Sequence, residues 1–108
     1  MPGEWIEKAD VLLREFVERV TRRLGRCAVL LFGSRARGDN LSYSDFDVAV
    51  VVEKVEDRIS LIEELRSLKP RGLPLDLIVL EVVELEDPIV RRMLKDVRLF
   101  ANNLGMDL

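Results

Sequence analysis

The sequence is constrained most by a glycine–serine turn that lies between two apolar segments. Residues 27–32 form a short apolar run, which predicts a buried strand. The turn Gly33-Ser34 follows directly, and ten residues separate it from a second predicted strand, the valine-rich segment 45–52. That strand opens with two carboxylates one residue apart, Asp45 and Asp47. The pattern predicts a phosphate-binding turn beside a metal-binding carboxylate pair.

The two residues of the turn suit a phosphate. Gly33 has no Cβ atom and so permits close approach of a ligand. Ser34 is predicted to cap the helical turn that follows, whose free N–H groups favour an anion, and to offer its hydroxyl to a phosphate oxygen. Taken alone, Gly-Ser is far more often an ordinary strand-to-helix connection. The downstream carboxylates are what favour the phosphate hypothesis.

Two arginines after the turn are candidates for nucleotide contact. Arg35 and Arg37 each offer a planar guanidinium group suited to phosphate oxygens. Solvated surface charges explain the two residues equally well.

The paired carboxylates are the clearest candidate metal ligands. Residues i and i+2 of a strand point to the same face, with Cα atoms ~6.5–7 Å apart, so Asp45 and Asp47 aim at one place. Two like charges ~4 Å apart repel by roughly 4 kcal/mol at an effective dielectric near 20, and a divalent cation reverses that sign. The alternative is a polar strand entrance at the surface.

A third carboxylate, Asp76, lies inside the apolar segment 73–80, which predicts a third strand. A lone carboxylate in such a run is costly unless it is paired or bound to metal. An exposed strand face is the alternative explanation.

Composition narrows the chemistry. The chain has 108 residues, a net charge of −3, no histidine and one cysteine, Cys27. We therefore expect one domain over residues 1–108, no zinc or histidine-based catalysis, and carboxylate chemistry with a hard cation such as Mg²⁺. A lone cysteine fits a reducing cytoplasm. None of the apolar runs is long enough to predict a membrane span. The negative net charge gives no general attraction to nucleic acid.

Helical patterns alternate with the strands and predict an α/β (α+β) domain in which helices flank a small sheet. We expect helices over residues 3–24, 57–69 and 88–101, the second capped near Asp57 and the third by Asp87 with Pro88 at its first position. Alternation alone suggests parallel crossovers. Four acidic residues at element ends are interpreted as solvated or capping residues: Glu53, Glu81, Glu84 and Glu86.

The segment Gly33-Ser34-Arg35-Ala36-Arg37-Gly38, followed by Asp45-Phe46-Asp47, resembles the minimal nucleotidyltransferases of the DNA polymerase beta superfamily. The resemblance covers nearly the whole chain and implies a mixed sheet of the polymerase-beta palm type. It implies that ATP is the substrate with one or two Mg²⁺ ions, and that Asp76 completes the triad as the base. The implied catalytic and metal residues are Asp45, Asp47 and Asp76, and the nucleotide-binding residues are Gly33, Ser34, Arg35 and Arg37.

The resemblance also implies a partner. Larger relatives append an acceptor-binding domain, whereas this sequence ends soon after the palm-like unit, so the acceptor surface is expected from another chain. Minimal members pair with helical HEPN proteins as toxin–antitoxin systems, which predicts AMP transfer from ATP to a tyrosine of that partner. The alternatives are a non-catalytic module that neutralises its partner by contact, and a homodimeric small-molecule nucleotidyltransferase. The basic residues Arg91, Arg92, Lys95 and Arg98 form either a docking face or a solvated face of the last helix.

Overall fold

A computed structural model describes residues 2–39 and 44–105, and within the first helix the side chains from residue 9 onward. The described elements in chain order are α1 (Pro2–Leu24), β1 (Ala28–Phe32), α2 (Gly33–Arg37), β2 (Phe46–Val52), α3 (Arg58–Arg66), β3 (Leu75–Glu81), the 3-10 helix η1 (Val82–Glu86), α4 (Pro88–Met93) and β4 (Arg98–Asn102). Among these helices, none is both long and apolar enough to cross a membrane.

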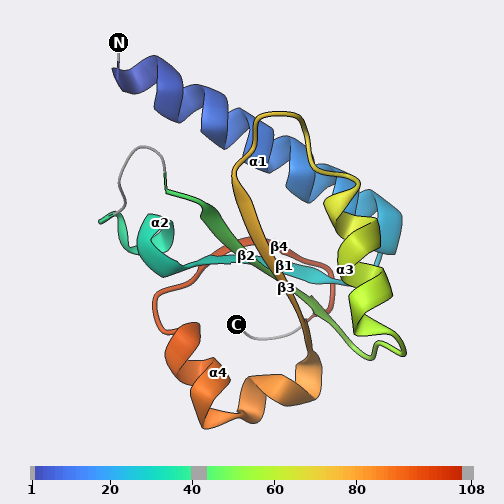
Figure 1. Ribbon diagram of the computed structural model, residues 1–108. Helices are drawn as coiled ribbons and strands as arrows, with labels where there is room; N and C mark the ends of the chain where they lie inside the picture. The colour runs from blue at the N-terminus through green and yellow to red at the C-terminus, as the bar shows by residue number, and fades with distance from the viewer. Residues whose placement is uncertain (1, 40–43, 106–108) are drawn as a thin grey trace.

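The strands form one four-stranded sheet in the order β3-β2-β1-β4 (Figure 1). β1 pairs antiparallel with both β2 and β4, whereas β2 and β3 are parallel. Parallel neighbours need a long crossover, and α3 lies in the connection between them. The mixed sheet confirms the predicted α/β (α+β) class. The all-parallel arrangement that simple alternation suggests is wrong.

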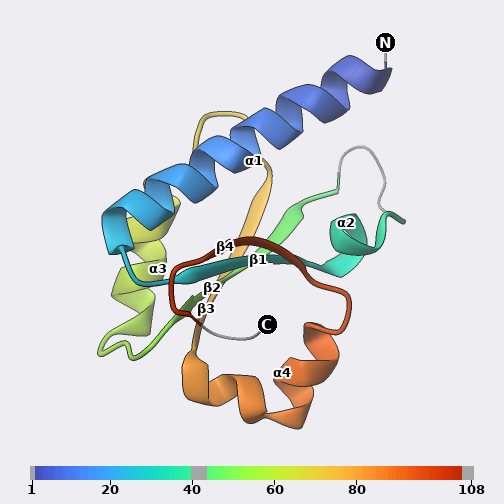
Figure 2. The ribbon, with the colours of Figure 1, turned by 180° about the vertical axis from the view of Figure 1, so that it is seen from behind.

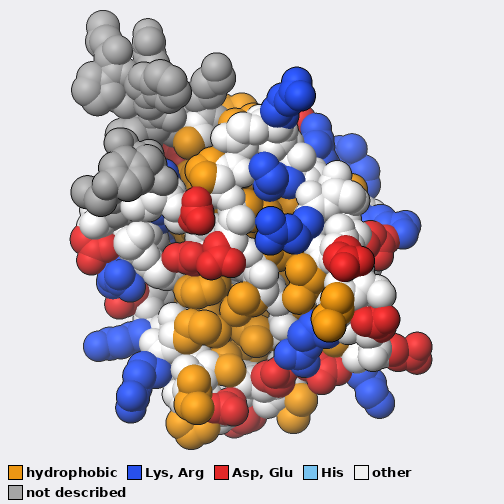
Figure 3. Space-filling view, viewed as in Figure 1, with side chains coloured by type: hydrophobic (Ala, Val, Ile, Leu, Met, Phe, Trp, Pro, Cys, Tyr) orange, Lys and Arg blue, Asp and Glu red, His pale blue; other side chains and the backbone are white. Residues whose placement is uncertain are grey.

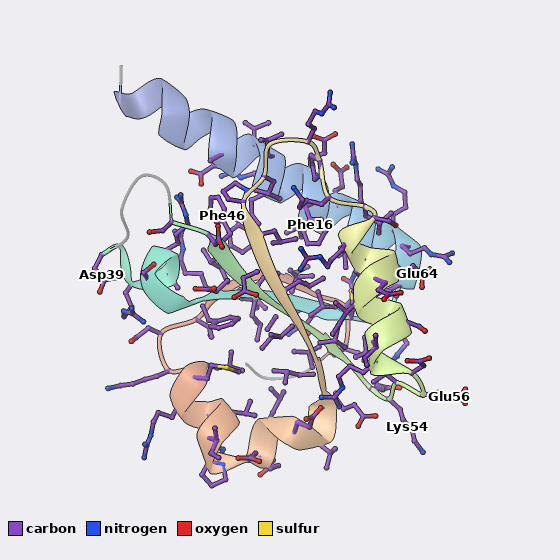
Figure 4. The ribbon with its side chains drawn as sticks, in the orientation of Figure 1. Phe16, Asp39, Phe46, Lys54, Glu56 and Glu64 are labelled. Atoms are coloured by element: carbon purple, nitrogen blue, oxygen red, sulfur yellow. The ribbon has the colours of Figure 1, made fainter. Side chains whose placement is uncertain are left out.

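α1 and α3 cover one face of the sheet and enclose the main core (Figure 2). Phe16 of α1 and Phe46 of β2 lie in the layer between helix and sheet and are almost completely buried (Figure 4). Alternate residues of β2, including Val48 and Val50, point into this layer, as the period of a strand requires. Most of the apolar surface buried by folding therefore lies on the α1 side of the sheet.

The opposite face is covered less completely, by η1 and α4. A smaller cluster of buried residues lies there, formed by Ala28, Leu30, Ala49, Val51 and Leu80. On η1 and α4 themselves, Val83, Ile89 and Met93 are exposed to 71%, 78% and 38%. Figure 3 shows these elements carrying apolar side chains at the surface. This face therefore keeps apolar surface that the described residues do not bury.

Two predicted helix caps are confirmed. The carboxylate of Asp57 accepts a hydrogen bond of 3.1 Å from the Ser60 N–H group at the start of α3. The carboxylate of Asp87 accepts one of 2.8 Å from the Ile89 N–H group, with proline in the first turn of α4. These side chains satisfy N–H groups that have no partner within the helix.

Acidic side chains tie the end of β3 to the region that precedes and begins α3. Glu84 accepts hydrogen bonds from the Glu81 N–H group at 2.9 Å and from the Arg58 guanidinium group at 2.6 Å. The Glu81 carboxylate accepts one of 2.9 Å from the Val55 N–H group. These donors hold the pKa of Glu84 below its usual value, the Glu81 N–H group first. The predicted capping role is confirmed for Glu81 and Glu84.

The prediction of a final helix over residues 88–101 is wrong in its second half. α4 ends at Met93, and Arg98–Asn102 form β4 along the outer side of β1. Without β4, the N–H and C=O groups on that side of a buried strand would have no partner. Tertiary pairing therefore overrides the helical spacing. Arg98 consequently does not share a helix with Arg91 and Arg92.

The burial of Val50 and the exposure of Val83 predict that a valine-to-alanine substitution affects stability differently at the two positions. Val50→Ala should lower the free energy of unfolding by about 2 kcal/mol, because Val50 is fully buried and its lost methyl groups leave a cavity. Val83→Ala removes the same atoms from an exposed side chain and should change stability by less than about 0.5 kcal/mol. Urea denaturation measures both, and equal midpoints would contradict the described core.

Candidate active site

The glycine of the turn lies against a carboxylate of the neighbouring strand. Phe32, the last residue of β1, pairs with Asp47 of β2, so Gly33 begins α2 beside Asp47. Gly33 has a φ of +75°, and a Cβ atom added there would lie 2.2 Å from Oδ2 of Asp47. Glycine satisfies both the backbone conformation and the close approach. The structure thus brings the turn and the second strand together, as the sequence predicts.

Asp47 and Asp76 lie opposite each other on the parallel strands β2 and β3. Phe46 points into the core under α1, so Asp47 faces the η1/α4 side. Asp76 lies between the core residues Leu75 and Leu77 and faces the same side for the same reason. Asp47 is half-buried and Asp76 is exposed. Two strands therefore bring their carboxylates together on one face of the sheet.

The third carboxylate, Asp45, is exposed and lies one residue before β2. The sequence predicts that the strand begins at Asp45, and this boundary is wrong by one residue. The charge of Asp45 nevertheless acts on Asp47, because it raises the pKa of that carboxyl. Asp45 therefore belongs to the same group of charges, from the segment that enters the strand.

The environment of Asp47 opposes its ionisation. Burial raises the pKa of Asp47 most, and the negative charges of Asp76 and Asp45 raise it further. A hydrogen bond to Asp76 acts in the same direction, whereas the guanidinium group of Arg37 lowers the pKa. The carboxylates are close enough to repel one another, so a bound cation at this place would stabilise the ionised forms.

Acidic and apolar surfaces adjoin on this face of the molecule. Figure 3 shows acidic side chains between α2 and β3, with apolar side chains below them toward α4. Exposed apolar residues on that side include Val83, Ile89 and Met93. A ligand bound at the carboxylates would therefore also meet apolar surface.

The structure distinguishes the two candidate arginines. Arg37 is exposed at the end of α2, where its Nε atom lies 3.1 Å from Oδ2 of Asp39. Its charge also reaches Asp47, whose pKa it lowers. Arg37 is therefore placed to contact an anion held near Asp47. The sequence patterns above do not predict the pairing of Arg37 with Asp39, for which the separation of only two residues is the available signal.

Arg35 instead contacts the segment that leads into β2. Its Nε–H group donates a hydrogen bond of 2.8 Å to the carbonyl oxygen of Ser44. Its guanidinium group lies 4.0 Å from the centre of the Phe46 ring, a cation–π contact on the α1 side of the sheet. The sequence patterns above do not predict this role of Arg35, although strand alternation does place Phe46 and Asp47 on opposite faces. Arg35 thus supports the residues on either side of Asp45.

Ser34 lies inside the first turn of α2 and is not its N-cap residue. The N-cap is Phe32, and no side chain caps this helix start. The predicted capping by Ser34 is therefore wrong. Its carbonyl oxygen closes the other end of α2, where it accepts hydrogen bonds from Gly38 at 2.9 Å and Asp39 at 3.1 Å. A hydroxyl contact to phosphate stays a prediction.

The available donors are carboxylate oxygens. Within residues 9–39 and 44–105, no three acidic, cysteine or histidine side chains are already grouped as ligands of one ion. Asp47 and Asp76, with Asp45 beside them, nevertheless form an all-oxygen donor set, which hard cations such as Mg²⁺ prefer. The site therefore fits such a cation in the chemistry of its donors.

Comparison with known families agrees with this geometry. A model of the nucleotidyltransferase domain family matches residues 13–101, a span that includes Gly33, Asp45, Asp47 and Asp76. The chain belongs to the nucleotidyltransferase domain family. A search of curated proteins gave no match.

A solved structure has a similar fold over nearly the full length of both chains. It is a crystal structure from Sulfolobus solfataricus, of a protein assigned as a nucleotidyltransferase. The TM-score is 0.74 and the sequence identity is 30%, and the match covers 99% of this chain and 92% of that chain. The similarity supports the minimal nucleotidyltransferase domain that the sequence resembles.

The contact between Gly33 and Asp47 predicts that an added methyl group impairs the site. Gly33→Ala and Gly38→Ala both place alanine at a positive φ, +75° and +83°. Among the described residues, the new Cβ atom would meet another atom within 4 Å at Gly33 and not at Gly38. We expect Gly33→Ala to slow nucleotide transfer about 100-fold more than Gly38→Ala, since small displacements of reacting groups are costly. Transfer rates and thermal midpoints measure this, and equal rates for the two variants would contradict a role for the contact.

The raised pKa of Asp47 predicts a pH-dependent cost to folding. Its unfolded-state pKa is 3.8, so the stability linked to this carboxyl is lost as the pH rises from below that value through the higher folded-state pKa. Asp47→Asn should therefore exceed the wild type in stability at about pH 7 without divalent metal, and lose this advantage at about pH 3. Urea midpoints test the difference. Asp96 is exposed and lies after α4, so Asp96→Asn should leave the urea midpoint close to that of the wild type.

Proposed function

We propose that this domain transfers AMP from ATP, in a magnesium-dependent reaction, to a hydroxyl group of a partner protein. The observation that carries the proposal is the meeting of Gly33, Asp47 and Asp76 on one face of the sheet. In this arrangement, a turn whose glycine permits close approach of a ligand lies next to carboxylates that repel one another. A phosphate and a divalent cation complement those two features.

Asp45, Asp47 and Asp76 are the residues that would hold one or two magnesium ions. All three offer carboxylate oxygens, and the raised pKa of Asp47 reflects negative charge that the fold leaves only partly neutralised. A bound Mg²⁺ would supply charge neutralisation for the triphosphate and the departing pyrophosphate.

The remaining residues bind and orient the nucleotide. Gly33 and Ser34 hold the triphosphate at the start of α2, and Arg37 adds a guanidinium group within reach of Asp47. Arg35 does not contact the nucleotide in this proposal but positions Asp45 through Ser44 and Phe46. The domain thus contributes mainly positioning and charge stabilisation.

The chemical step replaces a phosphoanhydride bond of ATP by a phosphoester bond at the α-phosphorus. The acceptor oxygen forms a bond to that phosphorus, and the bond from the phosphorus to the oxygen that bridges the β-phosphate breaks, so pyrophosphate leaves. Asp76, the exposed carboxylate opposite Asp47, accepts the proton of the attacking hydroxyl. The proton then passes to solvent, and the products are an AMP ester and pyrophosphate.

The apolar surface beside the carboxylates supports a protein as the acceptor. Val83 and Ile89 are exposed to 71% and 78%, and exposed apolar patches mark interaction surfaces. On the resemblance to minimal nucleotidyltransferases, the acceptor that we propose is a tyrosine of a HEPN protein in the same cytoplasm, with this domain as its antitoxin. The same surface favours a second candidate function, neutralisation of that partner by contact without transfer.

Label transfer from α-labelled ATP tests the proposal. The domain is incubated with Mg²⁺ and a candidate HEPN partner, and label on that partner is measured. We expect labelling that needs the metal and is lost in Asp45→Asn/Asp47→Asn, because the donors of the cation are removed. Asp96→Asn is the matched control and should label normally, since Asp96 lies outside this group of charges.

The outcomes separate the candidate functions. A stable complex without label from any of the four nucleoside triphosphates would reject transfer and leave neutralisation by contact. Label on a small molecule and none on the protein would reject the protein acceptor and favour a small-molecule nucleotidyltransferase.

A further inference from the structure

A cavity lies on the α1 side of the sheet, away from the carboxylates. Its volume is about 260 Å³, and α1, α2, β2 and β4 all contribute to its walls. Phe46 and Phe100 provide apolar wall, and both belong to the core face of the sheet. Asp47 follows Phe46 in β2 and therefore points to the opposite face. The sheet itself separates this cavity from the candidate active site.

Positive charge dominates the cavity. Arg14 of α1, Arg35 of α2 and Arg98 of β4 line it, and the acidic residue among its lining is Asp10. Arg14 and Arg98 have no carboxylate within ion-pair distance among the described residues. Three elements distant in sequence thus each contribute an arginine to the lining of one cavity. Arginine side chains gathered in this way complement a bound anion.

We propose that this cavity binds the phosphoryl groups of a small ligand, at a site separate from the one that carries out nucleotide transfer. Guanidinium groups offer paired N–H donors that match phosphate oxygens. Phe46 and Phe100 lie in the same lining, and attraction between opposite charges is stronger beside apolar groups than in bulk water. The ligand is either a free phosphate such as pyrophosphate or the phosphate part of a nucleotide, and both present the same chemistry to the arginines.

A ligand here would act on the segment that carries Asp45. Arg35 lines the cavity and also donates the 2.8 Å hydrogen bond to the carbonyl oxygen of Ser44. An anion that attracts this guanidinium group competes with its contacts to Ser44 and Phe46. The backbone amides of Ser44 and Asp45 therefore report on occupancy of the cavity from the other face of the sheet.

Amide chemical shifts of the full chain test the proposal directly. Pyrophosphate and ADP are titrated separately in the presence of EDTA, so that binding which depends on a divalent metal does not contribute. We expect saturable shifts at Arg14, Arg98 and Phe100 that extend to Ser44 and Asp45. Tighter binding of ADP assigns the site to nucleotides, and tighter binding of pyrophosphate assigns it to free phosphates.

Two variants provide the control. Arg14→Gln/Arg98→Gln should weaken binding at least about tenfold, because each arginine supplies charge-assisted hydrogen bonds. Arg92→Gln removes an exposed arginine of α4, which does not line this cavity, and should bind as the wild type does. The proposal is overturned if neither ligand gives saturable shifts at the cavity, if shifts arise only at Gly33 and Ser34, or if the double variant binds as tightly as Arg92→Gln. Shifts of the unliganded variants show whether each has kept its fold.

Discussion

The close approach of Gly33 to Asp47 is the constraint on which the candidate site depends. The position that a side chain would fill at Gly33 is taken by the carboxylate of the neighbouring strand, whose Oδ2 atom lies 2.2 Å from the missing Cβ position. The turn and the strand are therefore fixed relative to each other by the absence of one atom. Because β2 also pairs with β3, the same contact fixes where Asp76 lies relative to the turn.

Because strand side chains alternate between the two faces of the sheet, the residues of the main core lie on one face and the candidate site residues on the other. In β2, Phe46 and Val48 enter the main core while Asp47 between them faces the other side. The large core under α1 and α3 supplies the rigidity that confined like charges require. The face beneath η1 and α4 buries less, and it keeps both the carboxylates and the exposed apolar residues. A site that must admit a nucleotide and an acceptor is consistent with the more open of the two faces.

Much of this arrangement could be predicted from local sequence, and the exceptions share one physical cause. The strands around the turn and the caps Asp57 and Asp87 follow from local residue patterns, whereas Asp76 is assigned to the site by the family resemblance. β4 could not be predicted in this way, because its conformation is decided by the unpaired side of β1, a strand far away in sequence. The contact of Arg35 with Phe46 is likewise set by tertiary packing. Local patterns thus located the candidate residues, whereas long-range contacts separated Arg35 from Arg37.

The placement of β4 also determines when the sheet can be completed during synthesis. Ala28 of β1 pairs with Asn102, and β1 lies between β2 and β4 in the finished sheet. At about 5–20 residues per second, a ribosome needs roughly 4–15 s to extend the chain from the first of these residues to the second. During that interval one side of the apolar strand Ala-Val-Leu-Leu-Phe lacks its neighbour. Protection of this nascent strand against association with other chains falls to α1, which is already made, and to cellular factors that shield apolar segments.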